Sequence, residues 1–212
     1  FDHSVIDKKI KRVLHVGADR GGELPQYQQM GVEEVVWVEA NPEVYGELLE
    51  NLEIMNITDV KSLPFNQLVS DQDDIETDFN LYYGHDAGHL VGNKGCSSLL
   101  KAKGRFEEWF QETIKVETIT IDTLVEENDF EYADYDLLNL DVQGAEMLAL
   151  EGATKTLNSV NYISTEATWD NPDYIDNVMY DELKTFLESK GFKEEEIVNH
   201  GDNWGDILFV RS

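Results

Sequence analysis

Residues 13–22, Val-Leu-His-Val-Gly-Ala-Asp-Arg-Gly-Gly, predict a buried strand that passes through a glycine-rich turn into a helix. Val13 to Val16 form a short apolar run with β-branched residues, as in a buried strand. The glycines that follow permit a tight turn. Residues 23–30 then have helical character, and Gly31 is a typical residue for a helix end.

A second strand and helix follow directly. Residues 35–38 (Val-Val-Trp-Val) predict a strand that closes on Glu39. Asn41 then suits the N-cap of a helix, with Pro42 at its first position. The order strand, helix, strand, helix predicts a right-handed crossover and a parallel sheet of the α/β class.

The alternation of strands and helices continues along the chain and is interrupted once. Strands are predicted at residues 60–69, 80–84, 115–121, 136–140, 162–165, 192–198 and 207–210, and helices at residues 105–113, 145–157 and 179–190. The interruption covers about residues 77–121 and includes the glycine-rich stretch 84–104. We interpret it as a lid or hairpin inserted into a single domain, 1–212, and expect 84–104 to be mobile and to close over an acceptor.

Composition excludes several classes of protein. The 212 residues include 16 basic and 44 acidic ones, for a net charge of −28, so a general nucleic-acid binder is not expected. No apolar run approaches the ~20 residues that span a bilayer, and no signal segment opens the chain. We therefore expect a soluble, cytoplasmic protein with no membrane partner. Its oligomeric state stays open, and Cys96, the one cysteine, excludes an intrachain disulfide.

Three carboxylates follow predicted strands. Glu39, Asp141 and Glu166 each stand where a strand is expected to end. In an open parallel sheet, ligands bind at the carboxyl ends of the strands. The alternative is that these acids cap helices or lie in solvated loops. We expect Asp141 to lie where a substrate meets a cofactor.

The glycine turn favours a nucleoside-like cofactor over a dinucleotide. Residues 17–22 lack the G-x-G-x-x-G spacing that a pyrophosphate needs, which weakens an NAD-dependent alternative. Glu39 is well placed to accept the two hydroxyls of a ribose. S-adenosylmethionine is therefore the expected cofactor. We predict that it is held by Gly17, Ala18, Gly21, Glu39, Ala40, Asn41, Asn66, Gln67 and Asp141.

Four motifs together resemble one family. Val-Leu-His-Val-Gly-Ala at 13–18, Val-Glu-Ala-Asn-Pro at 38–42, Leu-Asp-Val-Gln-Gly-Ala-Glu at 140–146 and Thr-Glu at 165–166 resemble the FkbM family of S-adenosylmethionine-dependent methyltransferases. The resemblance extends from about residue 13 to the end. It implies the class I methyltransferase fold, a mostly parallel seven-stranded sheet with helices on both faces and the last strand antiparallel. It also implies O-methylation of a sugar or a small natural-product hydroxyl.

The chain departs from the family pattern at three positions. His15 stands where the family usually has an acid, Asp19 where it has Asn, and Gln143 where it has Glu. His15 and Gln143 are the main arguments for an alternative function, an inactive nucleoside-binding or S-adenosylmethionine-binding module that binds a partner protein. Retention of Asp141 and Glu166 argues for an enzyme.

The predicted catalytic residues are Asp141, Glu166 and His89. Asp141 is the first choice for the base that takes a proton from the acceptor hydroxyl, and the other two follow. His85 and His89 with Asp86 could bind a metal, but we expect polar loop residues and no metal. Cys96 is expected to be a partly buried thiol. For Trp169 and Trp204, stacking on a sugar ring and ordinary packing stay open.

Overall fold

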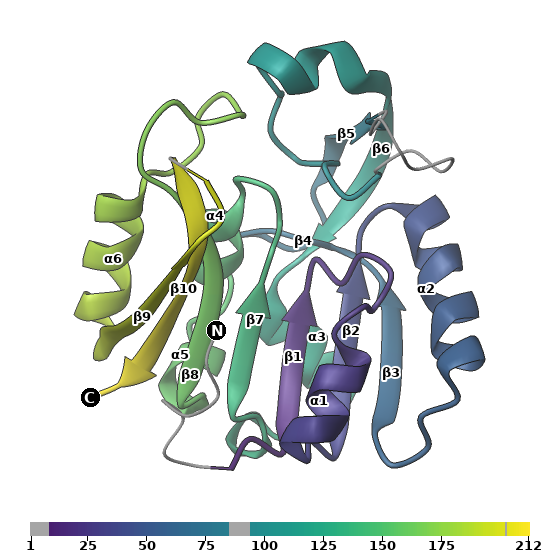
Figure 1. Cartoon of the computed structure of the whole chain (residues 1–212), viewed down its shortest axis with the longest axis vertical. Helices are drawn as coiled ribbons and strands as arrows, with labels where there is room; N and C mark the ends of the chain where they lie inside the picture. Colours follow the sequence, from purple (N-terminus) through teal and green to yellow (C-terminus); the bar gives the residue numbers. More distant parts are fainter. Residues whose placement is uncertain (1–8, 85–93, 202) are drawn as a thin grey trace.

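The computed structural model describes residues 9–84, 94–201 and 203–212, which fold around one large sheet (Figure 1). Its strands are β1 (Arg12–Val16), β2 (Glu34–Glu39), β3 (Lys61–Asn66), β7 (Leu137–Leu140), β8 (Tyr162–Thr168), β9 (Phe192–Asn199) and β10 (Trp204–Arg211). They are ordered β3-β2-β1-β7-β8-β10-β9, and β10 runs antiparallel to both of its neighbours. The predicted seven-stranded, mainly parallel sheet is confirmed.

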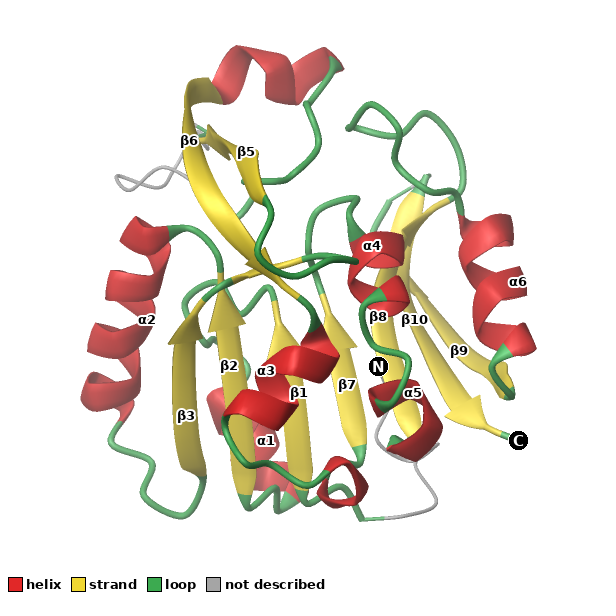
Figure 2. Ribbon diagram, turned by 180° about the vertical axis from the view of Figure 1, so that it is seen from behind, coloured by secondary structure: helices red, strands yellow, loops and turns green. Residues whose placement is uncertain are grey.

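Helices cover both faces of this sheet, as the two opposite views show (Figures 1 and 2). They are α1 (Leu24–Met30), α2 (Pro42–Met55), α3 (Ile121–Glu127), α4 (Glu146–Glu151), α5 (Thr156–Ser159) and α6 (Tyr180–Ser189). Alternate strand residues face opposite sides. Val13 and Trp37 therefore pack with residues of α1 and α2, whereas Leu14 and Val36 belong to a second core with residues of α3 to α6. None of the helices in the described residues is long and apolar enough to cross a lipid bilayer.

A smaller three-stranded sheet stands above the carboxyl ends of the parallel strands (Figure 1). Its strands are β4 (Leu68–Val69), β5 (Glu76–Tyr82) and β6 (Phe110–Ile119), and β5 and β6 pair as an antiparallel hairpin. The region that we interpret as an insertion, about 77–121, contains this hairpin. Residues 85–93 lie outside the described residues, so the predicted closing loop 84–104 is described only at residue 84 and from residue 94 onward.

The helix predicted at residues 105–113 is wrong in its second half. A 3₁₀ helix covers Gly104–Trp109, and Phe110 already begins β6. The ring of Trp109 lies against Gly84, where an added Cβ would come within 2.6 Å of it. This packing ends the 3₁₀ helix, and the alternating residues that follow extend the hairpin.

Two other predicted elements are divided in the structure. The strand predicted at 60–69 becomes β3 and β4, because Leu68 and Val69 leave the large sheet and pair with β6. Pro64 lies inside β3, an edge strand, where its missing N–H is tolerated. The helix predicted at 145–157 divides into α4 and α5 around Gly152, where a Cβ would lie 2.2 Å from the Ser70 carbonyl oxygen.

Two boundaries also differ from the sequence prediction. The strand predicted to reach residue 121 ends at Ile119, because the Thr120 side chain accepts a hydrogen bond from the Thr123 N–H and caps α3. Glu166 lies within β8, which continues to Thr168, and therefore does not end a strand as predicted. Its side chain consequently projects from the sheet surface and not from a loop.

Candidate active site

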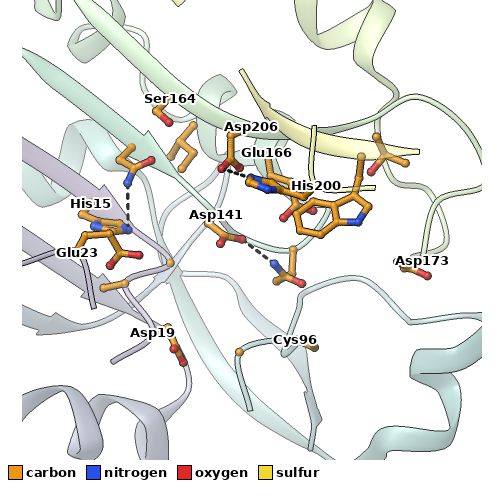
Figure 3. A pocket seen from close by; sticks show the side chains of 18 of the residues that line it. His15, Asp19, Glu23, Cys96, Asp141, Ser164, Glu166, Asp173, His200 and Asp206 are labelled. Atoms are coloured by element: carbon orange, nitrogen blue, oxygen red, sulfur yellow. Dashed lines mark hydrogen bonds and ion pairs between the residues drawn. The ribbon is translucent and has the colours of Figure 1, made fainter. Parts of the chain in front are cut away.

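A cavity of about 690 Å³ opens at the carboxyl edge of the large sheet (Figure 3). Its walls come from the turn after β1, the start of α1, the ends of β7 and β8, the segment at residues 173–177, His200, and residues 203–206. A second cavity of about 60 Å³ extends between the β2 end, β4 and the 94–99 segment. Both cavities are lined by Gly17, Asp19, Gly95, Asp141 and Gln143.

Gly17 and Asp141 are in backbone contact where the two cavities meet. The Gly17 N–H donates to the Val38 carbonyl oxygen at 2.9 Å, and the Asp141 N–H donates to the Val16 carbonyl oxygen at 3.0 Å. Gly17 has φ +81, and a Cβ there would lie 1.7 Å from the Asp141 carbonyl oxygen. Only glycine combines this φ with so close an approach. The turn after β1 and the end of β7 are thus fixed to each other.

The smaller cavity has one buried carboxyl and mostly apolar walls. Glu39 accepts hydrogen bonds from the Asp19 N–H at 2.9 Å and from the Asn41 N–H at 2.7 Å. Burial raises the pKa of Glu39 to about 7, although these hydrogen bonds oppose the shift. The apolar wall includes Phe79 and Leu99. Apolar walls beside a carboxyl acceptor match the chemistry of a base and a ribose, but about 60 Å³ is less than the volume of a nucleoside, so these walls must separate to admit one.

Not all of the residues predicted to bind the cofactor line a cavity. Ala18 lines the larger cavity, and Ala40 and Gln67 line the smaller one. Three others hold the backbone around Glu39 or α2 instead. The Asn41 side chain caps α2, the Asn66 side chain donates to the Glu39 carbonyl oxygen, and Gly21 faces Leu48.

Asp141 extends into the larger cavity from the end of β7. The Gln143 Nε2 donates to its Oδ1 at 2.6 Å, and Gln143 accepts in turn from the Tyr174 hydroxyl at 3.1 Å. The side chain of Asp141 is exposed to the open cavity. The protein atoms that surround the cavity raise its pKa by desolvation, as do neighbouring carboxyls such as Asp206 and Glu23, while the Gln143 hydrogen bond lowers it.

Glu166 and Asp206 stand opposite each other on β8 and β10, where the two residues are register partners. Burial raises the pKa of Glu166 strongly, and the nearby Asp141 raises it further. Both effects favour the protonated form of Glu166 relative to a free glutamate. Asp206 is hydrogen-bonded to His200, whose Nε2 lies 2.7 Å from its Oδ2. Figure 3 shows these groups together on one wall of the cavity.

The comparisons with known proteins point to one family. A family model described as "Methyltransferase FkbM domain" matches residues 15–194. The chain belongs to the FkbM methyltransferase family. No curated protein matches the sequence.

Solved structures share the fold at low sequence identity. An S-adenosylmethionine-dependent methyltransferase from Aquifex aeolicus has a TM-score of 0.53 and 13% identity, over 99% of this chain and 86% of that one. TrmK from M. capricolum, in complex with S-adenosyl-homocysteine, has a TM-score of 0.54 and 8% sequence identity, over 100% of this chain and 68% of that one. A putative tRNA (m1A22) methyltransferase from Streptococcus pneumoniae, in complex with S-adenosyl-L-methionine, has a TM-score of 0.53 and 13% sequence identity, over 99% of this chain and 71% of that one. The predicted fold is thereby confirmed, and two of these similar proteins hold forms of the predicted cofactor.

His15 is the clearest departure of this FkbM protein from the family pattern. Its ring is hydrogen-bonded to the Tyr27 hydroxyl at 3.1 Å and to the Asn139 amide at 3.3 Å. Burial lowers the pKa of His15 to about 3, so the ring is uncharged at neutral pH. The floor of the larger cavity therefore carries a neutral hydrogen-bonding group where the family usually has an acid.

The remaining sequence candidates have different environments in this FkbM protein. His85 and His89 lie outside the described residues, and the described residues include no cluster of three or more metal-ligating side chains. Cys96 is buried at the wall of the larger cavity. Trp169 stacks on Tyr180, with ring centroids 5.7 Å apart, whereas Trp204 lines the cavity.

Sequence reasoning missed several residues of the cavity. Asp206 and His200 were not singled out. A signal exists: Asp206 is a carboxyl residue directly before the apolar run 207–210, which predicts the last strand. Glu146 is buried, and its Oε1 accepts from the Val142 and Gly144 N–H groups at 3.1 and 3.2 Å, so it stabilises the turn after Asp141.

Proposed function

We propose that this protein transfers the methyl group of S-adenosylmethionine to a hydroxyl oxygen of a sugar or a small natural-product-like acceptor. The observation that supports this most is the meeting of two cavities at Gly17 and Asp141, one with apolar walls beside the Glu39 carboxyl and one large and acidic. When bound, S-adenosylmethionine supplies a methyl group that is already activated by a sulfonium. The protein then has to position two reactants and accept a proton.

In this proposal the residues that hold the cofactor lie around the junction of the cavities. Glu39 accepts hydrogen bonds from the ribose hydroxyls, since each of its oxygens has a further lone pair beyond those facing the Asp19 and Asn41 N–H groups. Phe79 and Leu99 contact the base. Gly17 and Ala18 present bare backbone to the amino-acid part of the cofactor. The carboxyls of the larger cavity favour a cationic centre beside Asp141.

Asp141 is the proposed base, and Glu166 is its protonated neighbour. Gln143 engages Oδ1 of Asp141, and Oδ2 has no hydrogen-bond partner among the described residues. A raised pKa makes this carboxylate a better proton acceptor near neutral pH. The raised pKa of Glu166 favours its protonated form in the ligand-free cavity, where it can donate a hydrogen bond. The net charge of −28 supports a small-molecule or glycan acceptor over a nucleic acid.

Two experiments test the proposed function. Calorimetry with S-adenosylmethionine, S-adenosylhomocysteine and NAD is expected to give binding of the first two only. Incubation with methyl-labelled cofactor and a panel of glycans and hydroxylated small molecules is expected to label an acceptor at oxygen. Binding without transfer to any acceptor would instead support the inactive binding module, and binding of NAD alone would overturn both.

A further inference from the structure

Glu166 in the larger cavity differs from the buried carboxyls of this protein in its partners. Asp122 accepts hydrogen bonds from the N–H groups of Lys155 and Thr156, and Glu146 accepts them from the N–H groups of Val142 and Gly144. In contrast, the Glu166 side chain has no hydrogen-bond or ion-pair partner among the described residues. These residues therefore satisfy most buried carboxyls internally but leave Glu166 open to a ligand.

Two buried hydroxyls flank Glu166 on the same side of β8. Ser164 and Thr168 are two residues before and after it, so all three side chains project from one face of the strand. Ser164 is 5% exposed and Thr168 is 8% exposed, yet both line the cavity, and neither hydroxyl has a hydrogen-bond partner among the described residues. Figure 3 shows Ser164 and Glu166 along this wall. Buried polar groups normally have hydrogen-bond partners. We therefore expect a polar ligand to bind to Ser164, Glu166 and Thr168, which together form a polar stripe on β8.

The charge and the aromatic groups of this wall select the kind of ligand. Among the described residues, no Lys or Arg side chain lines the larger cavity, whereas Asp206 faces Glu166 from the neighbouring strand. The indole of Trp204 lies beside them, its ring centroid 5.0 Å from that of His200. Carboxyls next to an aromatic face favour an organic cation.

We propose that the acceptor carries a protonated amine beside its hydroxyl groups, as an amino sugar or an aminocyclitol does. The amine binds between Glu166 and Asp206 next to the Trp204 ring. The hydroxyls bind to Ser164 and Thr168. This proposal rests on the proposed function, because it names the class of acceptor that the same cavity takes.

Proton exchange on binding provides an independent signature. Glu166 is faced by Asp141 after β7, Glu146 of α4, Asp173 of the 169–179 segment, and Asp206 of β10, which is itself bonded to His200. Burial and these carboxyls together raise the pKa of Glu166. A cation placed beside it reverses the balance, and Glu166 then releases its proton. A neutral acceptor produces no such release.

Matched pairs of probes test the proposal. Glucosamine and 2-deoxystreptamine are each titrated calorimetrically against their N-acetylated forms, with and without S-adenosylhomocysteine. The amines are expected to bind about tenfold to a hundredfold more tightly, as charge-assisted hydrogen bonds imply. Titrations in buffers of different ionisation enthalpy are expected to show proton release with the amines only.

Variants assign the preference to this wall. Glu166→Gln and Asp206→Asn should each bring the affinity ratio of amine to N-acetylated probe close to one. Glu127→Gln, an exposed carboxyl at the end of α3, should keep the ratio of the unmodified protein. Thermal melting confirms that each variant is folded. Amines that bind no better than their acetylated forms, or a ratio unchanged in both site variants, would overturn the proposal. S-adenosylhomocysteine binding measured alone reports separately on the proposed function.

Discussion

Gly17 lies so close to the carbonyl oxygen of Asp141 that the turn after β1 and the end of β7 form one unit. A methyl group on Gly17 would lie 1.7 Å from that oxygen, and the φ of +81 is itself unfavourable for other residues. The residue that begins the proposed cofactor turn and the proposed base therefore cannot move independently.

Gly17→Ala is expected to destabilise the fold and to abolish S-adenosylhomocysteine binding. The backbone strain alone costs about 1–3 kcal/mol, and relief of the clash must separate β1 from β7. Thermal melting and calorimetry measure the two effects. Gly22→Ala is the matched control, because nothing lies within 4 Å of an added Cβ there and its φ is ordinary. Equal melting temperatures for the two variants would contradict this account of the turn.

Glu39→Ala is expected to weaken S-adenosylhomocysteine binding by about 1–3 kcal/mol, because charged hydrogen bonds to the ribose are lost. The variant also leaves the Asp19 and Asn41 N–H groups without their acceptor, so melting is measured in parallel. Glu39→Gln keeps one acceptor oxygen and should fall between Ala and the unmodified protein. Glu50→Gln, exposed on α2, serves as the control. An unchanged affinity in Glu39→Ala would show that the ribose is held elsewhere.

Asp141→Asn is expected to slow methyl transfer by ~10²–10⁴-fold while S-adenosylhomocysteine binding stays nearly intact. Asn keeps the shape of the side chain and can still hydrogen-bond to Gln143, but it cannot take a proton. Single-turnover transfer to an acceptor found with labelled cofactor provides the rate. Asp74→Asn, an exposed turn residue with φ 58 that Asn also tolerates, is the control. A near-normal rate in Asp141→Asn would move the proposed base to another group, such as His200.

The melting temperature of the ligand-free protein is expected to rise as the pH is lowered from 8 to 6.5. Burial raises the pKa of Glu39 and Glu146 to about 7, from 4.5. Both carboxyls bind protons more tightly when folded, so their contribution to stability is full below pH 4.5 and is lost as the pH rises through 7. His15 acts in the opposite direction, but only below about pH 6.5, where the unfolded chain takes up its proton.

Glu146→Gln tests this assignment directly. Gln retains an oxygen in the position of Oε1, which accepts both the Val142 and the Gly144 N–H groups, so the turn should stay intact. The rise of melting temperature between pH 8 and 6.5 should become shallower than in the unmodified protein. Glu127→Gln should leave the slope as it is. A slope that is the same in all three proteins would remove Glu146 from the explanation.

Local sequence patterns predicted the first half of the sheet and the residues at its carboxyl edge. Gly17, Glu39 and Asp141 follow short apolar runs, and the pattern of each run depends only on its neighbours in the chain. The same reasoning predicted one helix over residues 145–157 and did not predict its division around Gly152, which packs against the Ser70 carbonyl oxygen, eighty-two positions away in the chain. Contacts between distant segments leave no periodic signal.

The acceptor side of the cavity could not be predicted for a related reason. His200 and Asp206 enter the site because β10 turns back and pairs antiparallel with β8, which sets Asp206 opposite Glu166. A shift of one residue in this register would send Asp206 to the other face of the sheet. Sequence alone identifies the strand but does not fix its register with β8.

The smaller cavity and the β8–β10 wall of the larger cavity come from different parts of the polypeptide, and this division bears on how the protein could diversify. The smaller cavity is lined by residues from Val16 to Ala145, whereas the stripe on β8 and everything opposite it on β10 come later in the chain. A chimera that takes its C-terminal third from another family member should therefore inherit that member's choice of acceptor while it keeps its own affinity for the cofactor. New acceptor preferences could arise in this way through recombination, without rebuilding the turn at Gly17.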